Sequence, residues 1–272
     1  MMRVWLDGRL QEVETARIDP RDRGFTLGDG LFETVRIARG DPQRFDRHLA
    51  RLRRGADLLG IAVPVSDAEL RGAVADLCAA EGMADAVLRI TLTQGPAARG
   101  LLPPPQPAPT LLLSVAPVPP PLPPAQLIVA RDTRRNELSP LSRVKSLNYL
   151  DNVLARREAE RRGGNEAVLL NSVGRVAETS IANLFLVRNG QLVTPPVAEG
   201  ALPGVLRAAI LEAQEVIEQP VEVADLLAAD EIVLSNSLGL RPVVSLERLP
   251  VGDGQPGPFC AALARRLSPT AE

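Results

Sequence analysis

The sequence predicts an α+β fold with two domains. Its strand-like segments pair through tight turns, at Asp7-Gly8 and Asn189-Gly190, which are typical of antiparallel hairpins. A proline run at residues 117–124 (PVPPPLPP) separates two apolar strand-like segments, as a semi-rigid spacer does. Strictly alternating βαβ units are missing, as are the motifs GxGxxG and GxxxxGKS/T, which argues against a Rossmann or P-loop protein.

The proline run also sets the expected domain boundaries. We expect an N-terminal α/β domain over residues 1–116, a linker over 117–124 and a C-terminal domain over 125–272. The chain has 272 residues, of which 45% are hydrophobic, so it is long enough for two domains that each bury a core.

Strands and helices are mixed in the predicted N-terminal domain. Apolar residues at close to helical spacing predict a helix over residues 45–60. Ser66 and Glu69 match a capping box that opens a second helix. Residues 31–38 and 86–93 are strand-like, because β-branched and other apolar residues dominate them.

The predicted C-terminal domain also mixes hairpins and helices. Residues 148–162 predict a helix that ends at a pair of glycines. Pro203-Gly204 opens a shorter helix, in which the proline suits the first helical position. The predicted strands lie at residues 167–170, 175–178, 184–187, 191–194 and 232–234.

The composition and the apolar pattern exclude several classes of function. The net charge is -2 with no basic excess, which argues against nucleic-acid binding. No apolar run is long enough for a signal peptide or a membrane span, so we expect a cytoplasmic protein. Cys78 and Cys260 form no metal or redox pattern, so we expect idle thiols and no metal site.

Lys145 is the only lysine among the 31 lysine and arginine residues. Arginine replaces lysine readily where only charge and solubility matter, but a guanidinium stays protonated and does not attack a carbonyl. The one lysine that remains is therefore a candidate for covalent chemistry, with a leftover surface lysine as the alternative.

Two other residue types also occur once, as His48 and Tyr149. A single histidine excludes a catalytic histidine pair and a multi-histidine metal site, and it argues against a Ser-His-Asp hydrolase. Tyr149 follows Lys145 by four residues, which is one turn if that segment is helical.

Four further positions are candidates for binding a charged group. Glu178 ends a predicted strand just before small polar residues, where a carboxylate either serves a bound group or makes a cap or salt bridge. An anion has three candidate sites, at Arg51, at the helix start of residues 203–206 and at Ser237. Two more arginines lie beside Arg51, and spacing alone does not choose among the three.

Six motifs follow one another along the chain: DRGFTLGDGLFETVR, RHLARL, KSLNYLDNVLARREA, AETSIANLF, LPGVLR and SNSLGLRPV. In this order they resemble the fold-type IV pyridoxal-phosphate enzymes, a two-domain α+β family that includes D-amino acid transaminases, branched-chain aminotransferases and 4-amino-4-deoxychorismate lyases. The resemblance extends from about Trp5 to Val244, and six ordered motifs make it specific.

The resemblance implies pyridoxal 5'-phosphate as the cofactor, bound largely by the C-terminal domain. It implies a homodimer whose active sites take residues from both subunits, and a small-molecule amine substrate. Lys145 matches the Schiff-base lysine, and Glu178 matches the partner of the pyridine nitrogen. The remaining cofactor-binding positions are Arg51, Val205, Leu206 and Ser237 for the phosphate and Tyr149 near the phenolic oxygen.

Two motifs resemble the lyases more than the transaminases. ETSIANLF replaces the Gly-rich EGxGENLF of branched-chain enzymes, and SNSLGLRPV differs from their SGTAAEITPV-type ending. We therefore expect a pyridoxal-phosphate-dependent 4-amino-4-deoxychorismate lyase, which releases pyruvate and 4-aminobenzoate in folate synthesis. The alternative is a class IV aminotransferase of D-amino acid or branched-chain type, which transfers an amino group to a 2-keto acid.

The expected substrate-binding residues are Arg99 and Arg36. D-amino acid transaminases clamp the substrate carboxylate with an Arg-x-His pair, but here Leu101 stands where the histidine would be. Lyases often carry an RGY-like element at this place, which Arg99-Gly100-Leu101 matches in part. A third possibility is a catalytically idle family member, which the retention of both Lys145 and Glu178 argues against.

Overall fold

The computed structural model describes residues 2–267 and divides the chain into two compact units. Unit 1 comprises Met1–Pro120 and Val144–Asn148, and unit 2 comprises Pro121–Arg143 and Tyr149–Glu272. The chain thus passes from unit 1 to unit 2 within the proline run. The expected division of the chain into domains at residues 1–116 and 125–272 stays a prediction.

Unit 1 is built on a six-stranded antiparallel sheet in the order β2-β1-β6-β5-β3-β4. The predicted hairpin is confirmed, because Asp7 and Gly8 join its first two strands with φ of 47° and 89°. Along β5, Leu88 and Ile90 are fully buried whereas Arg89 between them is exposed, so one face of the sheet carries the core. The strands are β1 (Arg3–Leu6), β2 (Arg9–Glu12), β3 (Gly30–Ala38), β4 (Asp41–Pro42), β5 (Ala86–Thr93) and β6 (Thr110–Ala116).

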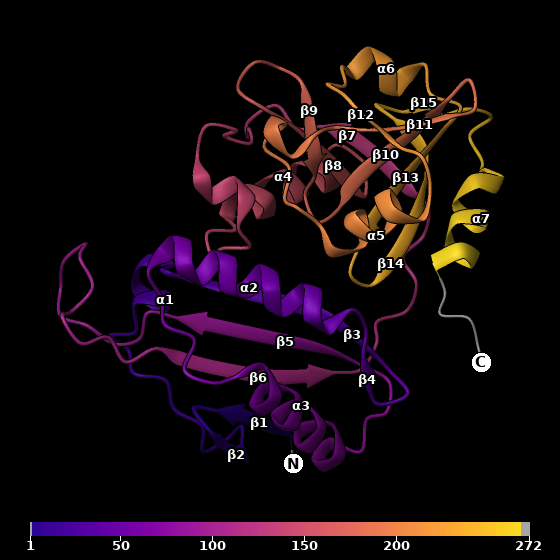
Figure 1. Cartoon of the computed structure of the whole chain (residues 1–272). Helices are drawn as coiled ribbons and strands as arrows, with labels where there is room; N and C mark the ends of the chain where they lie inside the picture. Colours follow the sequence, from indigo (N-terminus) through magenta and orange to yellow (C-terminus); the bar gives the residue numbers. More distant parts are fainter. Residues whose placement is uncertain (1, 268–272) are drawn as a thin grey trace. The chain divides into compact units, whose positions relative to one another are not determined.

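Two long helices, α2 (Phe45–Leu59) and α3 (Asp67–Glu81), pack against this sheet (Figure 1). Ser66 and Glu69 form the predicted capping box at the start of α3. A short helix, α1 (Arg23–Leu27), precedes β3. The two long helices share one apolar core with the sheet, to which they contribute Phe45, Leu49, Leu52, Leu70, Val74 and Leu77.

The segment Val144–Asn148 belongs to unit 1 because it pairs with the start of β3. The amide of Phe32 donates to the carbonyl of Lys145 at 2.9 Å, and the amide of Leu147 donates to the carbonyl of Gly30 at 2.9 Å. The expected C-terminal domain, residues 125–272, included this segment. Pairing between strands distant in sequence leaves no local signal, and this accounts for the difference.

Unit 2 is built on a nine-stranded mixed sheet in the order β12-β11-β10-β13-β14-β7-β8-β9, with β15 beside β14. The predicted turn at Asn189-Gly190 is confirmed, since both residues have positive φ and join β10 to β11. The strands are β7 (Ala125–Val129), β8 (Glu166–Leu170), β9 (Val176–Thr179), β10 (Asn183–Arg188), β11 (Gln191–Thr194), β12 (Ile217–Glu218), β13 (Glu231–Asn236), β14 (Gly239–Leu246) and β15 (Leu249–Pro250).

Helices cover this sheet at two places. Ala155 and Ala159 of α4 pack on β7 and β8, whereas Ile210 of α5 and Leu263 of α7 pack around Phe185 of β10. Among the described residues, no helix is long and apolar enough to cross a membrane. The helical segments are η1 (Pro140–Arg143), α4 (Leu150–Arg161), η2 (Val197–Glu199), α5 (Val205–Ala213), α6 (Val223–Leu227) and α7 (Pro258–Leu267).

Two predicted helix starts are wrong in detail. α4 begins at Leu150 with Tyr149 as its N-cap, so the residues from Lys145 to Tyr149 do not form a helical turn. α5 begins at Val205 with Gly204 as its N-cap, so Pro203 precedes the helix and is not its first residue. Both differences are of two residues, which is within the usual variation of helix ends.

Replacing Gly95 by alanine is predicted to destabilise unit 1. Gly95 has φ of +80°, and a Cβ there would lie 1.8 Å from the carbonyl oxygen of Ala108. We expect a loss of about 2 kcal/mol or more in the free energy of unfolding, measured by denaturant titration. Gly72→Ala is the control, because Gly72 lies in α3 with no atom within 4 Å of its Cβ position, so it should gain up to about 1 kcal/mol. Equal stabilities of Gly95→Ala and wild type would contradict the close approach.

Candidate active site

Lys145 is half-buried beside β3, next to an aromatic ring. Its Nζ lies 4.3 Å from the centre of the Phe32 ring, and the guanidinium carbon of Arg89 lies 4.1 Å from the same ring. The negative face of an aromatic ring attracts cations, so Phe32 interacts with both the amine of Lys145 and the guanidinium of Arg89. No motif singles out Arg89, whose only sequence signal is an arginine between two buried residues of a strand.

Arg51 lies on α2 and is held by a buried carboxylate. Its Nε and Nη2 donate to the two oxygens of Glu33 at 2.8 and 2.7 Å, and Nδ1 of His48 lies 2.7 Å from Oε2 of the same residue. Burial alone would raise the pKa of Glu33, but the charge and hydrogen bonds of Arg51 and His48 outweigh it and lower the pKa. The sole histidine therefore serves this cluster, and Arg51 is fixed in one orientation.

The sequence contains a signal for Glu33, which is a charged residue at a position where the strand pattern predicts an apolar one. It occupies a core-facing position of β3 between Leu31 and Val35, where alternation calls for an apolar residue. A buried carboxylate requires hydrogen-bonding or charged partners. The helix that packs on the strand supplies them here, through Arg51 and His48 of α2.

The structure gives the two expected substrate arginines different surroundings. Arg36 donates to the carbonyls of Ile37 and Ala86 and pairs with Asp85, so its side chain has structural partners. Arg99 is exposed on the loop that follows β5. This contrast favours Arg99 over Arg36 as the residue that reaches a substrate.

Glu178 is buried in unit 2 at the end of β9, as a carboxylate with several partners. Oε1 lies 3.2 Å from Nε of Arg135, and Oε2 accepts from the amide of Leu202 at 3.0 Å and from Nδ2 of Asn183 at 3.4 Å. These donors favour the ionised form, which is the form that holds a proton on a basic ring nitrogen. Arg135 carries no motif signal and is identified only by the structure.

The start of α5 has no side-chain cap. Its N-cap is Gly204, which provides no side-chain cap for the amides of Val205 and Leu206. A Cβ on Gly204 would lie 2.0 Å from Oδ1 of Asn183, so a larger residue would require the Asn183 side chain to move. Asn183 also donates to the carbonyl of Leu202 at 2.8 Å and thereby connects this loop to Glu178.

The other two expected cofactor residues lie at the ends of elements in unit 2. Ser237 is half-buried in the turn between β13 and β14, directly after Asn236. Tyr149 is half-buried at the N-cap of α4. Within residues 2–267 no three or more histidine, cysteine, aspartate or glutamate side chains gather in a way that could hold a metal.

Replacing Glu33 by glutamine is predicted to remove an acid-sensitive part of the stability. The folded-state pKa of Glu33 lies below its unfolded value, so the carboxylate stabilises the fold above about pH 4.3, and this is lost as the pH falls through the folded pKa. Unfolding free energies at pH 7 should differ by about 3 kcal/mol, because Arg51 is left buried without its anion. The difference should shrink in acid. Glu14→Gln, an exposed control, should cost less than about 0.5 kcal/mol, and a pH-independent loss in Glu33→Gln would contradict the role.

Three related proteins match almost the full length of the chain. A Methanocaldococcus jannaschii protein, provisionally named a branched-chain-amino-acid aminotransferase, is 32% identical over 98% of this chain and 95% of its own. The D-alanine aminotransferase of Bacillus licheniformis is 31% identical over 95% and 93%, respectively. The aminodeoxychorismate lyase of Bacillus subtilis is 32% identical over 96% and 92%.

Solved structures with the same fold include branched-chain amino acid aminotransferases from two organisms. The Escherichia coli enzyme superposes with a TM-score of 0.91 at 27% identity, covering 96% of this chain and 92% of its own. The T.th. enzyme with pyridoxamine 5'-phosphate has a TM-score of 0.91 at 25% identity, covering 98% and 92%.

The family described as Amino-transferase class IV matches residues 30–246, which include Lys145, Glu178 and the start of α5. The match, the relatives and the fold agree with the family that the six motifs resemble. The chain therefore belongs to the class IV aminotransferase family, with the α+β fold of fold-type IV enzymes and pyridoxal 5'-phosphate as cofactor.

Proposed function

We propose that the protein is a 4-amino-4-deoxychorismate lyase, which releases pyruvate and leaves 4-aminobenzoate. The observation that carries the proposal is the state of His48, which is 2% exposed and bonded to Glu33. The chain has no other histidine for an Arg-x-His clamp, and Leu101 occupies the position after Arg99-Gly100. The 32% identity to the Bacillus subtilis lyase supports the same assignment.

The turn after Glu178 supports the distinction from branched-chain enzymes. Oγ1 of Thr179 donates to the carbonyl of Ala182 and accepts from its amide, both at 3.1 Å. A glycine at position 179, as in the EGxGENLF motif, would lose both bonds. The ETSIANLF motif therefore builds its turn with side-chain contacts that a Gly-rich motif cannot make.

The residues present fit the cofactor. We propose that Glu178 faces the ring nitrogen, that Arg51, Ser237 and the amides of Val205 and Leu206 bind the phosphate, and that Tyr149 lies near the phenolic oxygen. The uncapped start of α5 and the buried, multiply bonded carboxylate of Glu178 supply the required donors and charge.

The proposed chemistry assigns a separate task to each residue. When bound, pyridoxal phosphate supplies an electron sink beside the substrate amine. Nζ of Lys145, as a neutral amine, takes the proton from the aminated carbon as general base. The ionised Glu178 holds a proton on the ring nitrogen, and Arg99 orients a substrate carboxylate.

A class IV aminotransferase is the second candidate. Relatives named as D-alanine and branched-chain aminotransferases match over nearly the whole chain, which favours it. It would use the same Lys145 and Glu178, and the bound cofactor would supply the means to transfer an amino group to a 2-keto acid.

We also propose the homodimer that the resemblance implies. Phe25, Leu101 and Leu102 are each more than 80% exposed in unit 1, and Arg23 fixes their neighbourhood by donating to the carbonyls of residues 100–102. Exposed apolar side chains of this size are typical of a subunit contact.

The cytoplasm is the proposed location. Cys78 and Cys260 are free and buried, as is usual for cysteines of a reducing compartment. Burial raises the pKa of both thiols, to about 11 for Cys260, so neither is poised to react.

An absorption spectrum of the holoenzyme with a panel of D- and L-amino acids is predicted to separate the two functions. The visible band of the bound cofactor should persist through the panel, and 4-amino-4-deoxychorismate should yield pyruvate. Lys145→Arg, which keeps the charge but cannot act as a free amine, should lose the band and the pyruvate. A band that bleaches with one amino acid, giving the pyridoxamine spectrum, would establish the transaminase.

Replacing Arg99 by alanine is predicted to raise the Michaelis constant for the carboxylate substrate. Loss of one charge-assisted hydrogen bond should raise KM by about tenfold, with a smaller change in kcat. Steady-state kinetics of pyruvate release measure this, with Arg9→Ala, an exposed arginine of β2, as control. An unchanged KM in Arg99→Ala would remove Arg99 from the substrate site.

A further inference from the structure

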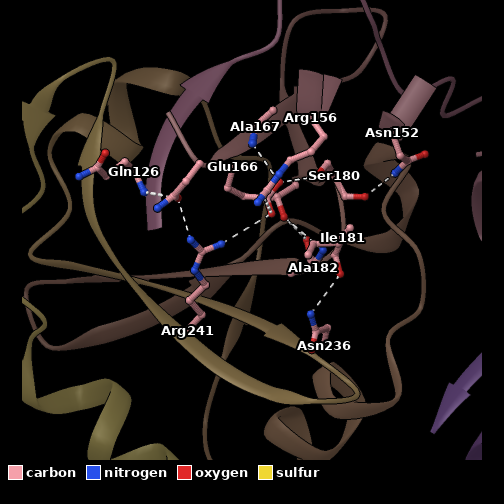
Figure 2. A network of polar contacts seen from close by, with 12 residues as sticks. Gln126, Asn152, Arg156, Glu166, Ala167, Ser180, Ile181, Ala182, Asn236 and Arg241 are labelled. Atoms are coloured by element: carbon pink, nitrogen blue, oxygen red, sulfur yellow. Dashed lines mark hydrogen bonds and ion pairs between the residues drawn. The ribbon is translucent and has the colours of Figure 1, made fainter. Parts of the chain in front are cut away.

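A second carboxylate, Glu166, lies fully buried in unit 2 at the start of β8. Its Oε2 accepts from Nη1 of Arg156 at 2.9 Å, and its Oε1 accepts from the hydroxyl of Ser180 and from the amide of Ser180 at 3.2 Å (Figure 2). Ser180 is two residues after Glu178. The carboxylate therefore binds the turn that follows the proposed partner of the ring nitrogen.

A second arginine extends the network away from the turn. Nη1 of Arg241 on β14 lies 3.9 Å from Oε2 of Glu166. Nε of Arg241 donates to the carbonyl of Pro123 at 2.7 Å, and Nη2 donates to Oδ1 of Asn165 at 2.7 Å. The charge of Glu166 is thus balanced from α4, through the hydrogen bond of Arg156, and from β14, through the longer ion pair of Arg241.

Two asparagines hold the same turn from other elements. Nδ2 of Asn152 on α4 donates to the carbonyl of Ser180 at 2.7 Å, and Nδ2 of Asn236 on β13 lies 3.5 Å from the carbonyl of Ile181 (Figure 2). Asn236 directly precedes Ser237, the proposed phosphate hydroxyl. The turn over residues 179–182 is therefore tied to α4 and β13 as well as to Glu166 on β8.

Stability alone does not account for this network. A buried ion pair contributes little compared with well-packed apolar side chains of the same volume, because both charges lose their hydration. The geometry of the network is specific, however. Glu166 accepts from both the hydroxyl and the amide of Ser180, and two bonds to one residue restrict where that residue can lie. Glu178 and Asn183 flank the turn, and Nδ2 of Asn183 donates to the Glu178 carboxylate at 3.4 Å.

We propose that Glu166 is a positioning residue for the cofactor ring, which fixes the 179–182 turn and thereby the direction of the Glu178 carboxylate. The inference rests on the proposed role of Glu178 and deepens it. Glu166 touches neither cofactor nor substrate, and it acts through Ser180. A neutral side chain of the same shape at position 166 would leave both arginines without their anion and the Ser180 hydroxyl with a weaker acceptor.

Glu166→Gln tests the proposal, with Glu158→Gln as the matched control. Glu158 is also buried in unit 2, and it pairs with Arg162 and accepts from the amide of Arg131, away from the turn. Both variants should lower the melting temperature of the apoenzyme. Only Glu166→Gln should raise the dissociation constant of pyridoxal phosphate, by about tenfold on titration of the apoenzyme. Equal effects of the two variants on cofactor affinity would overturn the proposal.

The absorption spectrum of the bound cofactor separates positioning from general destabilisation. Glu166→Gln should shift the pH midpoint of the visible band in the same direction as Glu178→Gln, whereas Glu158→Gln should leave it unchanged. A shift with Glu178→Gln but none with Glu166→Gln would overturn the positioning role alone. No shift with Glu178→Gln would overturn the site assignment and the inference with it.

Ser180→Ala covers the case in which Glu166→Gln does not fold. It removes the hydroxyl that joins the turn to Glu166 and keeps the ion pair of Glu166 with Arg156. The same weakening of cofactor binding and the same shift are expected, both smaller than in Glu166→Gln. A Ser180→Ala protein that binds the cofactor as wild type does, with an unchanged spectrum, would overturn the proposal.

Discussion

The candidate site in unit 2 depends on one buried anion, the carboxylate of Glu178. An isolated carboxylate out of water would take up a proton or destabilise the fold, because its hydration is lost. Arg135 on one oxygen and the amide groups of Leu202 and Asn183 on the other preserve its charge. These partners also join β9 to the loop before α5. The interactions of the Glu178 carboxylate therefore also hold the loop that precedes α5.

Local sequence signals predicted most elements of the fold. The Asp7-Gly8 turn, the Ser66 capping box and the Asn189-Gly190 turn each involve neighbouring residues, whose preferred conformations do not need the rest of the chain. The grouping of residues 144–148 with β3 had no such signal, because the pairing joins segments more than 100 residues apart. The helix starts at Leu150 and Val205 differ from the predicted starts by two residues, because local signals place a helix end only approximately.

The candidate site residues also fall into those with a sequence signal and those without one. Lys145 was singled out because it is the only lysine in the sequence, and Glu178 and the start of α5 because they lie in ordered motifs; their roles stay predictions. Arg89 and Arg135 were missed, since nothing in their neighbouring residues distinguishes them from the other arginines. Only tertiary contacts, with the Phe32 ring and with the Glu178 carboxylate, give them a candidate role.

The structural ion pairs of the buried acids are made by arginine, which bears on why a single lysine is present. The ion pairs that hold four buried acids, Glu33, Glu166, Glu178 and Glu199, are made by arginine. A guanidinium suits this task, because it keeps its charge when buried and donates along two directions. It cannot give up its proton near neutral pH, so it cannot become a base or a nucleophile. A chain that makes its structural ion pairs with arginine still requires lysine at a position where an amine must react, and Lys145 is the candidate for that position.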